Sequence, residues 1–274
     1  MLEEKSWQVT YPEGVVECLD LFRDKYLQYD VFDPLLHKYI QKYKLSSGNR
    51  ICSLGAGTGR HEIDMVQFGY EVVGLERDEK SVQIANELFE VHNVCVDMRV
   101  CDFLKPEDIH RVCSKMEKFD VIILLFVPIS MYDYHRALEN LKCYLNPGGI
   151  FITNCFGYKE EINRQKKVLK SDIEVVHNPK TKKPIVRLNY YEFENDIINW
   201  DAIYLVPDEN GYISMKTDHD ILGVCPEDEV EDPIFVNQEE FEILPNYKIT
   251  ECNDSMTPPA LYEYLVGRRY KGGE

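Results

Sequence analysis

Apolar residues along this chain follow two different periods, and the change between them divides the chain into segments. Between residues 47 and 156, short runs dense in apolar and β-branched residues alternate with stretches of helical periodicity. The runs are RICSLG, EVVGLE, CVDMRV and FDVIILLF. Continuous apolar runs of this kind are typical of parallel strands that helices cover on both faces. The pattern therefore predicts an alternating βα core over residues 47–156.

The helices of this core carry end signals, and a helical segment precedes them. HEIDMVQF is followed by Gly69, a residue that commonly ends helices. DEKSVQIANELFEVHN begins at Asp78, whose side chain suits the N-cap position. Residues 1–46 are rich in aromatic helical patterns, and in DPLLHKYIQKY we place Pro34 near the first turn. We expect residues 1–46 to form an N-terminal helical cap.

The alternation changes after residue 156. The charged segment YKEEINRQKKVLK predicts a helix, and short alternating stretches follow it to about residue 235. Turn signals, such as the Asn210-Gly211 pair, separate these stretches, which predicts an antiparallel meander. In residues 236–274, NQEEFEIL predicts a last helix, and YKITECN and ALYEYLVGRR predict two closing strands of the core. Residues 157–235 are therefore expected to be an insertion into the core.

A glycine-rich turn connects the first predicted strand to the helix behind it. In ICSLGAGTG the glycines stand at every second position, which lets the backbone pass close to a ligand. The next strand ends in Glu76, whose carboxylate can accept hydrogen bonds from two vicinal ribose hydroxyls. A dinucleotide fingerprint needs a small residue where this chain has Arg60. The pattern predicts a nucleoside site that is not a dinucleotide site.

This turn resembles motif I of the class I S-adenosylmethionine-dependent methyltransferases. Over roughly residues 45–156, further segments match that family in the same order: VVGLE, MRVCDFLKP, and the run from KFDVIILLF to the Pro-Gly-Gly turn. Two positions depart from the family pattern, Glu76 in place of the usual Asp and Ser81 in place of a common apolar residue. The resemblance implies a Rossmann-like α/β fold, with a seven-stranded, mostly parallel sheet whose last strand is antiparallel.

The resemblance also implies the cofactor, S-adenosyl-L-methionine, and the residues that bind it. Asp102 falls where family members accept a hydrogen bond from the adenine 6-amino group, with Phe103 and Leu104 beside the ring. The expected cofactor-binding residues are Gly55, Ala56, Gly57, Gly59, Glu76, Arg77, Asp102, Phe103, Leu104 and Phe126.

The insertion at residues 157–235 lies where small-molecule members of this family often carry a lid over the substrate, as in sugar-amine and amino-acid N-methyltransferases. Core packing, capping or sheet packing would also explain each of the candidate substrate-lining residues, which are Tyr26, Tyr29, His135, Tyr191 and Trp200. Methyl transfer from a sulfonium depends mainly on alignment, and a base is needed only for a protonated nucleophile. The sequence contains no catalytic signature, and the catalytic residue stays unknown.

Composition narrows the function classes. A formal net charge of −17 disfavours nucleic acid backbones and membrane surfaces as partners. The nine cysteines include no C-x-x-C pair, which favours a reducing compartment and no metal site. The chain shows neither a membrane-spanning apolar run nor a signal peptide at MLEEKSWQVT, so we expect a cytoplasmic enzyme.

These observations predict an enzyme that transfers a methyl group from S-adenosylmethionine to a small molecule, at nitrogen in the first place and at oxygen in the second. Two alternatives stay open. One is an RNA or protein methyltransferase on the same core, and the other is a binding module that keeps the cofactor pocket without catalysis. The insertion could also serve as an oligomerisation surface, which would make the protein a homo-oligomer.

Overall fold

The computed structural model of this chain describes the core almost continuously and the insertion in pieces. The described residues are 16, 21–22, 29–127, 131–157, 170–178, 181–194, 197–207, 210–211, 213–225, 239–245, 247–249 and 262–272. Within these ranges, no helix combines the length and the apolar composition that crossing a bilayer requires.

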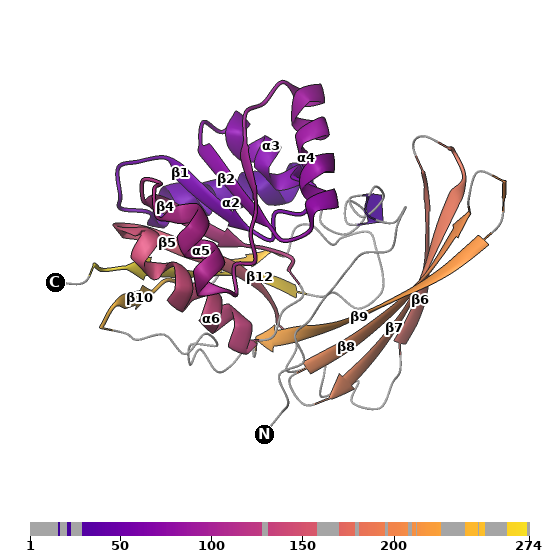
Figure 1. The fold of residues 1–274 in the computed structure, drawn as a ribbon. Coiled ribbons are helices and arrows are strands. Elements are labelled where there is room, and N and C mark those ends of the chain that lie inside the picture. The colour runs from indigo at the N-terminus through magenta and orange to yellow at the C-terminus, as the bar shows by residue number, and fades with distance from the viewer. Residues whose placement is uncertain are drawn as a thin grey trace.

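Parallel strands form the centre of the molecule, and their order sets where a ligand can bind. They are β1 (Arg50–Leu54), β2 (Glu71–Glu76), β3 (Asp97–Val100), β4 (Phe119–Leu124) and β5 (Leu145–Gly157). They lie in the order β3-β2-β1-β4-β5 (Figure 1). The direction of winding therefore reverses between β1 and β4, and open α/β sheets bind ligands at the carboxyl edge of such a switch point.

The last strand closes the sheet in the opposite direction. β12 (Tyr262–Tyr270) pairs antiparallel with β5 along most of its length. On its other side it pairs antiparallel with β10 (Phe241–Ile243) and β11 (Tyr247–Ile249). This arrangement confirms the predicted mostly parallel sheet with an antiparallel last strand.

The predicted helix NQEEFEIL is wrong in its described part. Residues 239–240 form a turn, and β10 begins at Phe241. Phe241 is buried while Glu242 is exposed, which is the alternation of a strand, and Glu242 pairs with Arg269 of β12. Strand six therefore starts earlier than YKITECN. Because Pro245 has no N–H to donate, it interrupts the strand between β10 and β11.

Helices cover both faces of the sheet (Figure 1). One face carries α2 (Tyr29–Tyr43), α3 (Arg60–Gln67) and α4 (Glu79–His92). The other carries α5 (Pro106–Cys113) and α6 (Met131–Leu141), and the 3-10 helix η2 (Lys142–Tyr144) follows α6.

The starts and ends of these helices test the signals read from the sequence. Helix α2 begins earlier than predicted, so that Pro34 lies inside it rather than in its first turn. The predicted N-cap of α4 is confirmed, because Asp78 accepts hydrogen bonds from both the backbone N and the Oγ of Ser81 at 2.7 Å. Ser81 thus stabilises the start of the helix. The predicted end of α3 is also confirmed, since Gly69 follows it with a φ of +91°.

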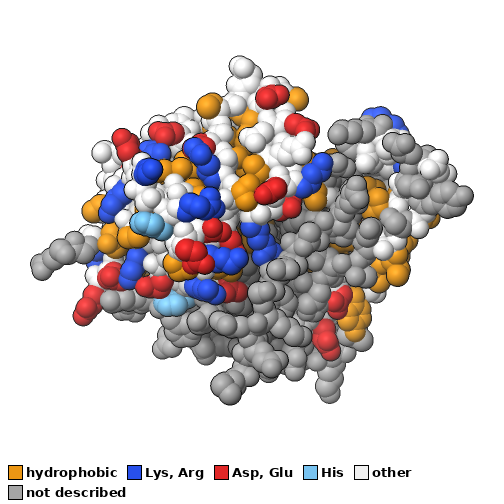
Figure 2. Space-filling view, in the orientation of Figure 1, with side chains coloured by type: hydrophobic (Ala, Val, Ile, Leu, Met, Phe, Trp, Pro, Cys, Tyr) orange, Lys and Arg blue, Asp and Glu red, His pale blue; other side chains and the backbone are white. Residues whose placement is uncertain are grey.

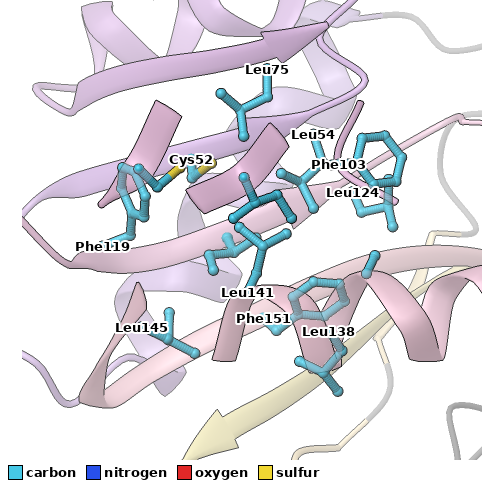
Figure 3. Packing of buried hydrophobic residues seen from close by; sticks show 14 of the residues in the cluster. Cys52, Leu54, Leu75, Phe103, Phe119, Leu124, Leu138, Leu141, Leu145 and Phe151 are labelled. Atoms are coloured by element: carbon cyan, nitrogen blue, oxygen red, sulfur yellow. The ribbon is translucent and has the colours of Figure 1, made fainter. Parts of the chain in front are cut away.

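The core between the sheet and α6 is packed with aliphatic and aromatic side chains. Figure 3 shows Leu54, Leu124 and Phe151 of the strands directed toward Leu138 and Leu141 of α6. Every residue of β4 is buried. This is the burial expected for a central parallel strand, and it explains why its sequence reads as one apolar run.

The insertion forms the predicted antiparallel meander. Its strands are β6 (Lys170–His177), β7 (Pro184–Glu194), β8 (Ile197–Pro207) and β9 (Ile213–Cys225), each paired with the next. β9 also pairs in parallel with the tip of β5 at Phe156–Val224 and Gly157–Cys225, so the meander extends from that edge of the core (Figure 1). The predicted helix YKEEINRQKKVLK lies outside the described residues, apart from Lys170, which begins β6.

One face of the meander holds a buried polar network. The Glu174 carboxylate accepts hydrogen bonds from Arg187, with which it forms an ion pair, and from Asn189 at 2.7 Å. Trp200 Nε1 donates to Asn189 Oδ1 at 3.0 Å. The Arg187 guanidinium also lies 4.5 Å from the ring centroid of Phe22, so this face packs against Phe22.

Candidate functional site

The glycine turn is hydrogen-bonded to the end of the neighbouring strand β2. The backbone N–H groups of Gly55 and Ala56 donate to Leu75 O, at 2.8 and 3.2 Å. Gly55 has a φ of +64°, and a Cβ there would lie 2.5 Å from Val127 Cγ2. A side chain at this position would therefore fill the space beside the turn and strain its backbone.

Glu76 has a structural role that the sequence did not show. Its Oε2 accepts from Gly57 N at 2.9 Å, and its Oε1 accepts from Asp78 N at 2.9 Å. The carboxylate therefore links the turn after β1 to the start of α4. Each carboxylate oxygen has about two acceptor positions, so both oxygens retain the capacity to accept a ribose hydroxyl. Arg77, which follows, is exposed.

The close packing of α4 against the start of α3 requires a glycine at position 59. Gly59 caps α3 with a φ of +81°, and a Cβ there would lie 2.4 Å from Phe89 Cζ and 3.1 Å from Ala85 Cβ. Both neighbours belong to α4. The third glycine of the motif thus lets α4 approach the turn closely.

Asp102 and Phe103 lie at the carboxyl edge after β3. Asp102 Oδ1 accepts from Leu104 N at 3.1 Å, and its Oδ2 lies 3.2 Å from Lys105 Nζ. The Phe103 ring is largely buried, and its Cε1 lies 3.6 Å from the position that a Cβ on Gly55 would take. Phe103 therefore borders the glycine turn, while Leu104 packs against the core cluster beneath it.

An aromatic group stands at the switch point between β1 and β4. Phe126, two residues after β4, has a φ of +56°, and its N–H donates to Asn154 Oδ1 at 2.7 Å. Its ring stacks on His61 of α3, with centroids 5.4 Å apart and planes at 12°. Tyr29 of α2 meets the same imidazole edge-on at 4.7 Å. A positive φ is uncommon for a bulky residue, and such backbone strain often marks functional sites.

A buried acid is paired with this imidazole. His61 Nδ1 lies 2.6 Å from Asp33 Oδ1, and Asp33 is fully buried on α2. Burial raises the pKa of Asp33, and the charge of His61 opposes that shift. Sequence reasoning missed both residues. The available signal was the charged run Arg60-His61-Glu62 directly after the turn.

This carboxyl edge fits an adenosyl cofactor, because it combines a glycine-rich turn, an acid with acceptor capacity and a bordering aromatic ring. A family model described as a methyltransferase domain matches residues 45–200. The chain belongs to the class I S-adenosylmethionine-dependent methyltransferases.

Two curated relatives match this methyltransferase over part of its length. A probable S-adenosyl-L-methionine-dependent methyltransferase, TehB of Haemophilus influenzae, is 24% identical over 108 residues, which is 39% of this chain and 35% of TehB. A ubiquinone biosynthesis O-methyltransferase of Coxiella burnetii is 21% identical over 119 residues, covering 43% of this chain and 48% of that protein. The chain thus matches less than half the length of these curated relatives.

A solved structure matches nearly the whole fold. The sugar N-methyltransferase KedS8 from Streptoalloteichus has a TM-score of 0.66 and 16% identity, with 96% of this chain and 97% of that chain covered. At this identity the likeness concerns the fold.

The remaining candidates occupy different parts of the methyltransferase. Tyr29 lies in the aromatic group at the switch point, while Tyr26 lies outside the described residues. His135 is on α6, which covers the sheet face opposite to α3, and its Nδ1 is buried without a hydrogen-bond partner among the described residues. Tyr191 and Trp200 form a stacked cross-strand pair in the meander, with ring centroids 6.1 Å apart.

A hollow of about 730 Å³ lies at the other end of the sheet. Its lining includes Arg50, Glu71 and Asp120, which stand at or near the amino ends of their strands. Ligands of open α/β sheets bind at the carboxyl ends instead. The hollow is therefore separate from the glycine turn and its acid.

Proposed function

We propose that this methyltransferase transfers the methyl group of S-adenosylmethionine to an amine nitrogen of a small molecule. The observation that carries the proposal is the four-stranded meander between β5 and the last strands. The fold likeness to a sugar N-methyltransferase covers 96% of this chain and so takes in most of this meander as well as the core. This supports a lid over a small acceptor.

Different core residues would bind different parts of the cofactor. Glu76 would accept from the ribose hydroxyls and Asp102 from the adenine 6-amino group, with Phe103 along the ring. Gly55 and Gly57 would let the backbone approach the methionine end. Glu76 ends β2 and Asp102 comes two residues after the neighbouring β3. Phe103 borders the turn, which supports one continuous site.

Methyl transfer depends mainly on the alignment of the two reactants. The acceptor's lone pair attacks the methyl carbon in line with the departing sulfur, and the protein contributes by holding both partners and excluding water. A meander at the carboxyl edge is suited to exclude water. An amine that arrives as an ammonium must first lose a proton.

The charge of the chain supports a small acceptor over RNA. A net charge of −17 repels a polyanion and favours cationic amines nearby. Oxygen is the second candidate, because the Coxiella burnetii relative is named as an O-methyltransferase. Its match spans only 43% of this chain, so it supports the shared core more than the acceptor.

Transfer of a tritiated methyl group tests the proposal. The enzyme is incubated with labelled S-adenosylmethionine and fractionated cell extract, then with defined sets of amino sugars, amino acids and catechols. We expect label in the small-molecule fraction and in amines. Label in RNA or protein would refute the small-molecule assignment. Cofactor binding with no transfer to any fraction would indicate a binding module.

The lid role of the meander can be tested separately. Replacing Tyr191 or Trp200 by Ala should reduce transfer to the identified acceptor while S-adenosylhomocysteine binds as before. Tyr190, exposed on the opposite face of the same strand, provides the matched control variant Tyr190→Ala. If neither Tyr191→Ala nor Trp200→Ala changes turnover, the meander is better explained as an oligomerisation surface.

A further inference from the structure

The geometry points to Asp33 and His61 as the site of the acceptor's amine, which they bind as an ammonium and from which His61 takes a proton. This inference rests on the function proposed above. It names the groups that would prepare the nucleophile.

The pair stands at the switch point of the sheet. His61 is in the first turn of α3, directly behind the glycine turn that follows β1, and the Phe126 ring stacked on it follows β4. β1 and β4 are neighbours in the sheet. The imidazole is therefore held at the carboxyl edge between these two strands, where ligands of open α/β sheets bind. Asp33 reaches it from α2 at 2.6 Å.

The pair has an acceptor atom without a donor. Asp33 is fully buried, and no described donor reaches its Oδ2. The neighbouring Asp64 carboxyl group interacts with Asp33 and, after burial, also raises its pKa. Oε2 of Glu62, which is also buried, likewise has no donor among the described residues. An unpaired buried carboxylate is costly, so these oxygens favour a bound cationic donor.

The charges around the pair also favour a cation. From α2 it is faced by Tyr29, and from α3 by Arg60, Glu62 and Asp64. Arg60 is engaged by Asp64 at 2.8 Å and lies 4.9 Å over the Tyr29 ring. Burial raises the pKa of Asp33 and of Glu62, because a carboxylate charge is costly away from water. An arriving ammonium reduces that cost.

The proposed step conserves protons and electrons. An N–H bond of the ammonium breaks, and the proton moves to the imidazole of His61 while Asp33 stabilises the imidazolium. The freed lone pair forms the N–C bond to the methyl group, the C–S bond breaks, and its electron pair stays on sulfur. The imidazolium then releases its proton to water. In this step Asp33 would contact the amine through Oδ2 and hold the imidazole through Oδ1.

A pair of cofactor analogues tests the inference without knowledge of the acceptor. Sinefungin carries an amine where the cofactor carries its methylsulfonium, whereas S-adenosylhomocysteine has no charged group there. Both have the same α-ammonium. Calorimetry should show that Asp33→Asn weakens sinefungin about tenfold or more, with S-adenosylhomocysteine changed less than about twofold. The preference of the wild type for sinefungin should rise with pH as the pair loses its proton. In Asp33→Asn this rise should move to lower pH, because the imidazolium loses the carboxylate that stabilises it.

Controls keep the outcomes separate. Asp30→Asn removes a carboxylate from an exposed position of the same helix and should leave both affinities unchanged. If Asp33→Asn does not fold, His61→Gln decides by the same comparison. Equal loss of both ligands would overturn the inference, because it would assign the pair to the cofactor's own α-ammonium. Unchanged affinities would leave the pair a structural link and also overturn it. Failure of the wild type to bind either ligand would refute the proposed function itself.

Discussion

Replacing Glu76 by Ala should weaken both the cofactor site and the fold, because this carboxylate joins the glycine turn to α4. It accepts from Gly57 N and Asp78 N, each at 2.9 Å. A net hydrogen bond contributes about 0.5–1.5 kcal/mol, so loss of the two should lower the free energy of unfolding by about 1–3 kcal/mol.

A loss of cofactor affinity should accompany this loss of folding stability. If Glu76 also holds the ribose hydroxyls, removing hydrogen bonds to a charged group should cost about 1.5–3 kcal/mol of binding free energy. Since about 1.4 kcal/mol is a factor of ten, S-adenosylhomocysteine should bind about 10- to 150-fold more weakly. Asp102→Ala should cost less, because a single amino-group contact is lost.

Calorimetric titration with S-adenosylhomocysteine measures the affinity, and chemical denaturation measures the stability. Glu79→Ala is the control, since Glu79 is an exposed carboxylate in the first turn of α4. NAD should not bind any of these proteins, because Arg60 stands where the dinucleotide motif needs a small residue. A folded Glu76→Ala protein that binds S-adenosylhomocysteine as tightly as the wild type would refute the assignment of the site.

Three stability predictions concern other parts of the fold, and denaturation measurements check each. Gly59→Ala should lower the free energy of unfolding by about 2–5 kcal/mol, because the residue has a left-handed backbone and its new Cβ would clash with α4. At Gly69 a Cβ meets no atom within 4 Å, so Gly69→Ala should cost only the backbone strain, about 1–2 kcal/mol. Arg187→Met should cost about 3–5 kcal/mol by leaving the buried Glu174 carboxylate without its charge partner, and adding Glu174→Leu should restore most of it. Glu62 has a pKa raised by burial, so its folded form loses stability as pH rises above the unfolded value of 4.5. Glu62→Gln should therefore raise the melting temperature at neutral pH, and a gain that persisted below about pH 4 would contradict this account.

The alternation of strands and helices could be predicted from the sequence because its signals are local. Apolar runs marked β1, β2 and β4, and Asp78 and Gly69 marked helix ends, since each signal depends on a few neighbouring residues. The glycine turn and the strand-end acid were equally local, so the cofactor edge of the site followed from spacing. The helix predicted for NQEEFEIL failed because its short pattern also suits a strand. Only pairing with β12 selected the strand.

Contacts between distant segments were decided by the tertiary structure alone. Asp33 and His61 are 28 positions apart, and no local pattern in either segment predicts their contact. Their contact exists because α2 and α3 pack on the same face of the sheet. The polar network of Glu174, Arg187 and Asn189 likewise depends on the register of β6 and β7. Sequence by itself determined the family, the order of elements and the cofactor edge, since these follow from local periods and spacing. The environment of the switch point required the fold, because burial and charge there are set by residues that only packing brings together.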